Sequence, residues 1–309
     1  MSLRWIVLVI LLAFLAAMPK FLVSYYVQLT YAIFLYTTLA ASYDLVGGHM
    51  GYMNLGHAIF YGLGTYAFGL AFKAGGGLVG GLATAAAVAV LFAAAMSYPF
   101  FRMRGAYFAL GTLGLIFLME LLGLNLRGIT QGAHGLDITP GDRLNPVYYL
   151  ALALVVSTLG TVYVLSRSRY GLALRSIRED EEAAASFGID VMRYKVMTLM
   201  LSAFFAGLMG GLNMWHESYI NPEEAFGLEI AFVPIVMAMV GGTGLVSGPV
   251  VGVILVYVIQ EVLWTRIGFL QVAMYGFLLM LVGVLMPGGV VRYLRLDRLF
   301  PSDYKPRTL

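Results

Sequence analysis

A strongly charged stretch, Ser166–Lys195, interrupts an otherwise apolar sequence. The chain has 19 Lys and Arg residues and 16 Asp and Glu residues, and 11 of these lie within the 30 positions of this stretch. The flanking segments, 147–165 and 196–214, are apolar runs. A polar loop between two membrane spans suits recognition of a soluble partner, so we expect a docking surface there.

One helix is predicted over residues 171–187 of this loop, because Ala and Leu dominate and proline is absent. Two arginines each precede a glutamate by four positions, in the pairs Arg175–Glu179 and Arg178–Glu182. Such pairs lie on one face of a helix and modestly support an exposed helix.

The loop also contains the pattern E-A-A-x-x-x-G, formed by Glu182, Ala183, Ala184 and Gly188. A further alanine follows Ala184, and we expect the three alanines to offer a small, bare surface to another protein. Gly188 is expected to end the helix in the left-handed conformation, and Asp190 to cap the next span. Such a helix would pass a partner's movement into the membrane. The alternative is an ordinary alanine-rich loop helix with a glycine cap, since short motifs recur freely.

Polar side chains at membrane depth form a second group of candidates. Such side chains are costly in lipid and usually face the interior of a helix bundle. They are Asp44, Asn54, His57, Glu120 and Glu261. Residues 47–64 hold six glycines, so we expect a helix that is broken or begins late.

Broken helices supply backbone groups to substrates in many transporters. We therefore take Asn54, His57 and Glu120 as candidates for a translocation path. The alternative for Asn54 and His57 is hydrogen bonding to neighbouring helices. The alternative for Glu120 is a structural ion pair with Arg127, seven residues further on.

Several chemistries are not supported by the sequence. The chain has no cysteine, which excludes disulfides and Cys-based metal sites, and His57 has no second histidine or carboxylate at the spacing of a metal site. No nucleophile–base pair stands out, and none of the four lysines follows a glycine-rich phosphate loop. We expect a non-catalytic chain without a cofactor of its own.

Composition indicates an integral membrane protein, because 61% of residues are hydrophobic and only 11% are charged, against about 25% charged in soluble domains. The predicted fold class is an all-α polytopic bundle of about ten transmembrane helices, since each span needs roughly 20 apolar residues. The first 18 residues resemble a signal peptide but lack a clean cleavage site, so we predict a retained span. The expected spans are 3–18, 22–46, 51–72, 78–101, 105–124, 146–165, 196–215, 227–240, 247–263 and 269–286.

Charge predicts the orientation of these spans. With both termini in the cytoplasm, 14 of the 19 Lys and Arg residues face inward, as the positive-inside rule requires. We then expect residues 1–309 to form one transmembrane domain, with a cytoplasmic loop at 166–195 and a periplasmic loop at 125–145.

Five stretches, taken together and in order, resemble the LivM-like permease subunits of branched-chain amino-acid ABC importers. They span most of the chain and are far more specific than any single motif. One feature departs from the general importer pattern: residues 198–201 read Thr-Leu-Met-Leu where Ile-x-Leu-Pro would be expected. The stretches are LVGGHMGYMNLGHAIFYGLGTYAF (45–68), FRMRGAYFALGTLG (101–114), TQGAHG (130–135), SRYGLALRSIREDEEAAASFGIDVMRYK (168–195) and VGGTGLVSGPVVG (240–252).

The resemblance implies a permease subunit of the bacterial inner membrane that moves branched-chain or related amino acids into the cytoplasm. Its implied partners are a second permease subunit, two cytoplasmic ATPase subunits that bind ATP and magnesium, and a periplasmic binding protein, with no role for nucleic acid. The loop at 171–190 would be the coupling helix in an ATPase groove, with Arg175, Arg178, Glu182, Ala183, Ala184 and Gly188 as its residues.

The substrate and the pairing of the permease, with itself or with a different subunit, stay open at the level of sequence. Relatives in this family also carry other amino acids, urea or short amides. The alternative function is a stand-alone, ion-coupled secondary transporter of a small polar solute. That alternative explains the buried acids but assigns no role to the charged loop.

Overall fold

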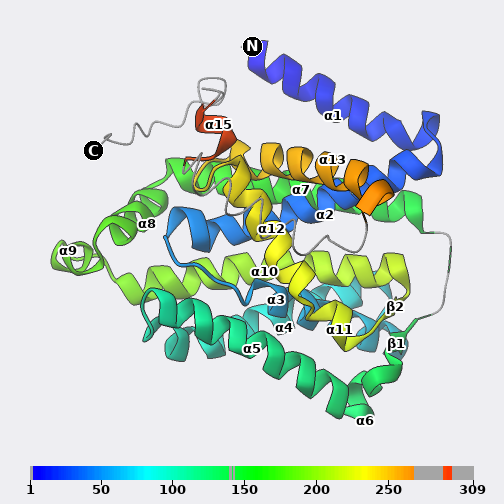
Figure 1. Ribbon diagram of the computed structural model, residues 1–309, viewed down its shortest axis with the longest axis horizontal. Coiled ribbons are helices and arrows are strands. Elements are labelled where there is room, and N and C mark those ends of the chain that lie inside the picture. The colour runs from blue at the N-terminus through cyan, green and yellow to red at the C-terminus, as the bar shows by residue number, and fades with distance from the viewer. Residues whose placement is uncertain (1–2, 139–140, 142, 268–287, 294–309) are drawn as a thin grey trace.

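The computed structural model describes residues 3–138, 141, 143–267 and 288–293. Within them, long helices lie side by side in a layered bundle (Figure 1). The expected all-α polytopic architecture is confirmed for this part of the chain, and six helical stretches are long and apolar enough to cross a membrane. The tenth expected span, 269–286, lies outside the described residues. The long helices are α1 (Leu3–Phe21), α2 (Ser24–Asp44), α3 (His57–Ala71), α4 (Gly77–Phe101), α5 (Ala106–Asn125), α7 (Leu144–Arg167), α10 (Val191–Glu217), α12 (Leu228–Gly241) and α13 (Ser247–Ile267).

Helices α3, α4 and α10 form the tightest part of the core, and glycine makes their close approach possible. A Cβ atom on Gly207 would lie 2.5 Å from the Cβ of Ala89, and one on Gly211 would lie 2.9 Å from the Cβ of Ala85. On the other side of α10, a Cβ on Gly210 would overlap the carbonyl oxygen of Tyr61 in α3. Small residues four apart let helix backbones pack closely in membranes, so the spacing of Gly207 and Gly211 has a direct structural use.

Two of the expected spans are joined as a hairpin. Helix α3 passes into a π-helical turn, η2 (Phe72–Gly76), where Gly75 has a φ of 89° and breaks the helical path. The chain then returns as α4, whose Gly81 packs against the ring of Phe68 in α3.

Helix α3 begins late, as its glycine content predicts. The π-helical turn η1 (Leu45–His49) extends α2, and residues 50–56 are not helical. Gly51, with a φ of 83°, occupies the left-handed region that glycine tolerates. The helix starts only at His57, so this segment offers backbone groups that no helix satisfies.

The remaining elements are short. Two-residue strands β1 (Leu136–Asp137) and β2 (Tyr219–Ile220) pair antiparallel. They lie at the end of the bundle opposite the helices of the charged loop (Figure 1), so residues 125–138 and the charged loop are on opposite sides. The short helices are α6 (Arg127–Thr130), η3 (Gly132–His134), α8 (Arg169–Glu179), α9 (Glu181–Ser186), α11 (Pro222–Ala225) and α15 (Gly289–Tyr293).

Candidate functional site

The charged loop contains two short helices where the sequence predicts one. Helix α8 ends at Glu179 and α9 begins at Glu181, because Asp180 has an extended backbone with φ −156° and ψ 113°. The Asp180 carboxylate accepts hydrogen bonds from the amides of Glu182 at 2.9 Å and Ala183 at 3.0 Å. The prediction of a continuous helix over 171–187 is wrong, because aspartate favours an N-cap over a helix interior.

The end of the loop matches the prediction. Gly188 has a φ of 83° and follows α9. Asp190 then caps α10, accepting a hydrogen bond from the amide of Arg193 at 3.1 Å. The loop is therefore joined directly to a long membrane helix through a glycine turn and a capped helix start.

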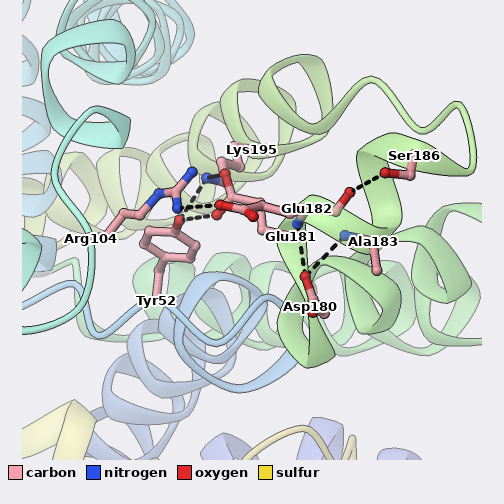
Figure 2. Close-up of polar contacts among 8 residues, drawn as sticks. All are labelled: Tyr52, Arg104, Asp180, Glu181, Glu182, Ala183, Ser186 and Lys195. Atoms are coloured by element: carbon pink, nitrogen blue, oxygen red, sulfur yellow. Dashed lines mark hydrogen bonds and ion pairs between the residues drawn. The ribbon is translucent and has the colours of Figure 1, made fainter.

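Four charged side chains and one tyrosine fasten α9 to the body of the protein (Figure 2). The Lys195 ammonium donates to Glu181 at 2.5 Å and to the Tyr52 hydroxyl at 2.6 Å, and Tyr52 donates to Glu181 at 2.6 Å. Arg104 pairs with Glu182 at 3.1 Å. We call these five residues the loop anchor: Tyr52, Arg104, Glu181, Glu182 and Lys195.

The two halves of the loop anchor differ in burial. The Lys195 side chain is 2% exposed and that of Glu181 is 25% exposed, whereas Glu182 is 81% exposed. Partial burial acts to raise the pKa of Glu181, but hydrogen bonds from Lys195 and Tyr52 outweigh it and hold that pKa below its ordinary value. Burial and the bond to Glu181 raise the pKa of Tyr52. Glu181 is thus a carboxylate with two donors at neutral pH.

The predicted pairing of Arg178 with Glu182 is wrong. Arg178 instead donates to the carbonyl oxygen of Gly48, at the end of η1, and Glu182 pairs with Arg104. The break at Asp180 is the physical reason, because it removes the helical register that would bring the two side chains together. Arg175 donates to the carbonyl of Ser166 at 3.0 Å, within the loop itself.

The alanines of the E-A-A pattern do not share one exposed face. Ala184 is 2% exposed and belongs to the main apolar core, whereas Ala183 and Ala185 are exposed. The expectation that Ala184 faces a partner is corrected, since it packs on its own chain. The neighbouring Phe187, 87% exposed, is the large apolar side chain at the outer face of α9.

A cavity of about 630 Å³ lies beside the loop anchor. Its walls come from the non-helical segment 50–53, the residues at 104–106 that lead into α5, and the junction of α8 and α9 at 177–182. Three segments far apart in sequence therefore meet around the base of the charged loop.

Among the polar candidates within the membrane, His57 has neutral partners. Its Nε2 lies 3.0 Å from the Ser42 hydroxyl of α2, and its Nδ1 lies 3.5 Å from the Ser202 hydroxyl of α10. Ser202 also donates to the carbonyl of Ser42 at 2.7 Å. His57 is 2% exposed, so it joins three helices, as the structural alternative predicts.

Asn54 and Glu120 are placed differently. Asn54 is also 2% exposed and lies in the non-helical segment before α3. Glu120 is partly exposed on α5 and forms no ion pair with Arg127, both residues being within the described part of the chain. The three candidates for a translocation path therefore do not form one cluster of contacts. The side chain of Glu261 is outside the described part.

Sequence reasoning missed four members of the loop anchor: Tyr52, Arg104, Glu181 and Lys195. Arg104 and Lys195 entered only as positive charges that fix the orientation. Only the positions of Arg104 and Lys195 could have indicated this role. Each lies at the start of an apolar span, next to a loop, where a cation can reach a carboxylate. Among the described residues, no group of three or more His, Cys, Asp or Glu side chains could hold a metal ion.

The fold and the anchored loop define a polytopic helical membrane protein with a rigid polar segment between two spans. The family model described as the permease component of branched-chain amino acid transport systems matches residues 25–285. The chain belongs to this family, and it is a non-catalytic membrane component of a transport system. This membership excludes the reading of a stand-alone secondary transporter.

Individual relatives agree with this family. The high-affinity branched-chain amino acid transport system permease protein LivM of Escherichia coli K12 is 30% identical, over 92% of this chain and 74% of the relative. LivM of Salmonella typhimurium LT2 is 29% identical, over 83% of this chain and 68% of the relative. LivH of Escherichia coli K12 is 23% identical, over 83% of this chain and 91% of the relative. No solved structure matches the chain.

Proposed function

We propose that this chain is the membrane subunit through which branched-chain amino acids enter the cytoplasm, driven by ATP hydrolysis in partner subunits. Family membership supports the assignment of a permease component, and the similarity to LivM, a branched-chain amino acid permease protein, supports the substrate class. The predominantly apolar interior suits substrates with apolar side chains that need a passage more than a tight binding site.

The proposed complex contains a second permease subunit, two cytoplasmic ATPase subunits that bind ATP and magnesium, and a periplasmic binding protein. The similarity of the chain to both LivM and LivH supports a paired permease. The charged loop is the proposed contact with an ATPase subunit. Two observations support this contact. The loop anchor and the buried Ala184 hold the inner side of α9 against the protein, and Ala183 and Phe187 remain exposed on its outer side.

Reconstitution tests this function directly. Proteoliposomes containing the permease pair and the ATPase subunits should take up labelled leucine only when ATP is inside and the loaded binding protein is outside. Omission of the ATPase subunits should abolish uptake. Uptake by this chain alone, driven by an ion gradient, would contradict the proposal.

The proposed orientation places both termini and the charged loop in the cytoplasm of a bacterial inner membrane. The absence of cysteine makes single introduced thiols clean probes. Ala133→Cys should react with an impermeant thiol reagent in intact cells, whereas Ser186→Cys should not. Both positions are exposed, so a reversed pattern would overturn the orientation rather than report burial.

The route through the membrane is proposed to pass the non-helical segment before α3. Asn54 is the proposed lining residue, since its buried side chain lies where α3 has not yet begun. His57 is close in sequence, but its two serine partners favour a packing role. Glu120 is the next candidate, on the partly exposed face of α5.

A further inference from the structure

Two glycine-rich turns from distant parts of the sequence meet near the charged loop. The first is the end of η1 at Gly48, and the second follows α12 at Gly244. A Cβ atom on Gly48 would overlap the amide nitrogen of Gly244, and one on Gly244 would lie 3.2 Å from the carbonyl oxygen of Gly48. The two backbones are therefore in contact without intervening side chains. We call Gly48 and Gly244 the glycine junction.

A buried carboxylate holds this junction together. Both oxygens of Asp44 accept from the amide of Gly244, each at 3.0 Å. Asp44 is fully buried, and its second neighbour is His49, whose Nδ1 lies 3.4 Å from one carboxylate oxygen. Through these hydrogen bonds Asp44 ties the α2 side of the bundle to the turn after α12.

Arg178 of α8 reaches into the same junction from the charged loop. Its guanidinium donates to the carbonyl oxygen of Gly48, and a Cβ on Gly244 would lie 3.2 Å from the same guanidinium nitrogen. Its aliphatic stem rests on Gly51, where a Cβ would lie 2.8 Å from the Arg178 Cγ. One side chain therefore contacts both turns and the non-helical segment that precedes α3.

The position of Arg178 on α8 gives this contact a mechanical consequence. The preceding residue, Ile177, is 3% exposed, and Leu174 is 1% exposed. Helix α8 is thus packed on the bundle, and a shift of α8 that moves Arg178 must break its bond to Gly48. The hydrogen bond is directional and fails when donor and acceptor separate beyond about 3.5 Å.

We propose that Arg178 is a positioning residue that links the charged loop to the glycine junction, so that movement of the loop loosens the contact between the two turns. The inference rests on the proposed function, because it assigns the loop's movement to an ATPase partner. Arg178 then acts on the membrane helices of its own chain and does not contact the ATPase partner.

The test uses the reconstituted transporter and compares Arg178→Ala, Arg178→Lys and the matched control Arg169→Ala. Arg169 is an exposed arginine of the same helix. ATP hydrolysis and leucine uptake are measured per assembled complex, with and without the loaded binding protein. Arg178→Ala should assemble and hydrolyse ATP, but its uptake per ATP should fall about tenfold, as expected for loss of a charged hydrogen bond. Arg178→Lys should restore part of the coupling, and Arg169→Ala should keep the wild-type uptake per ATP.

A distance measurement separates this role from simple stabilisation of the loop. Spin labels on Met53→Cys and Thr243→Cys report the separation between the non-helical segment that follows η1 and the turn after α12, in a chain without native cysteine. Without ATP, the Arg178→Ala complex should show a broader or longer distance than the wild type. Wild-type coupling and wild-type distances in Arg178→Ala would overturn the inference while leaving the proposed function intact. Absence of ATP-driven uptake by the wild type would instead overturn the proposed function.

Discussion

The side chains of His57 and of the charged loop are held by different chemistry. His57 is surrounded by neutral hydroxyl groups from α2 and α10, whereas Glu181 is bound by the ammonium of Lys195 and the hydroxyl of Tyr52. Neutral hydrogen bonds satisfy a buried group without the desolvation cost of an ion. The loop instead uses ions near its aqueous boundary, where Glu181 keeps a quarter of its surface exposed.

This difference separates fixed parts of the molecule from parts that face a partner. The His57 cluster joins helices that form one packed core, and nothing in it requires movement. The loop anchor fixes only the inner side of α9, and leaves Ala183 and Phe187 available outside. Variants in the His57 cluster and in the charged loop test whether this distinction holds.

The largest effect is expected from Ala184→Arg. Ala184 is 2% exposed, so an arginine there must be buried without a partner or must push α9 away from the body. Overpacking alone costs about 1–3 kcal/mol, and an unpaired buried charge adds to it. Uptake should be lost, and protease cleavage near α9 should increase.

Ala183→Arg is the control for this variant, because Ala183 is exposed on the same short helix. It should leave the thermal unfolding temperature in detergent unchanged, although it alters the proposed partner surface. Equal stability of the two arginine variants would contradict the buried position of Ala184.

Lys195→Met is expected to have the next largest effect. It preserves the length and apolar packing of the side chain but leaves the Glu181 carboxylate with only the Tyr52 donor. Removal of one partner from a buried polar contact costs about 1–3 kcal/mol of stability. Because Glu181 is partly exposed, we expect a cost near the lower end of this range. The thermal unfolding temperature in detergent should fall. Arg193→Met, an exposed position two residues earlier, should leave it unchanged.

His57→Leu tests the other side of the comparison. It leaves the hydroxyls of Ser42 and Ser202 without their ring partners, although each serine keeps a backbone acceptor. We expect a loss of about 1–2 kcal/mol in stability, and uptake per assembled complex close to that of the wild type.

Asn54→Leu should behave in the opposite way, with lower uptake per complex and little loss of stability. If His57→Leu lowered uptake per complex while stability held, His57 would belong to the route and not to the packed core. Unchanged specific uptake in both variants would remove this segment from the proposed pathway.

Sequence predicted the elements better than the contacts between them. Nine of the expected spans correspond to helices of the described part, because long apolar runs and capping residues such as Asp190 act locally. The break at Asp180 does not follow from helix propensity, because the alanine-rich sequence after it favours a continuous helix. The partners of Arg178 and Lys195 cannot be read from local sequence, because Gly48 and Tyr52 lie more than a hundred residues away.

The smallest effect is expected from Glu182→Ala. Glu182 belongs to the E-A-A pattern, yet its side chain is 81% exposed and its partner Arg104 is 65% exposed. Water and salt screen such a pair, so its contribution to stability is small. We expect an unfolding temperature within a degree or two of the wild type, a smaller decrease than for Lys195→Met. Measurements at low and high salt provide the control, since the small difference should shrink as salt rises. A loss of stability equal to that of Lys195→Met would show that the outer pair fastens α9 as firmly as the buried one, and the division of the loop anchor into a strong inner half and a weak outer half would be wrong.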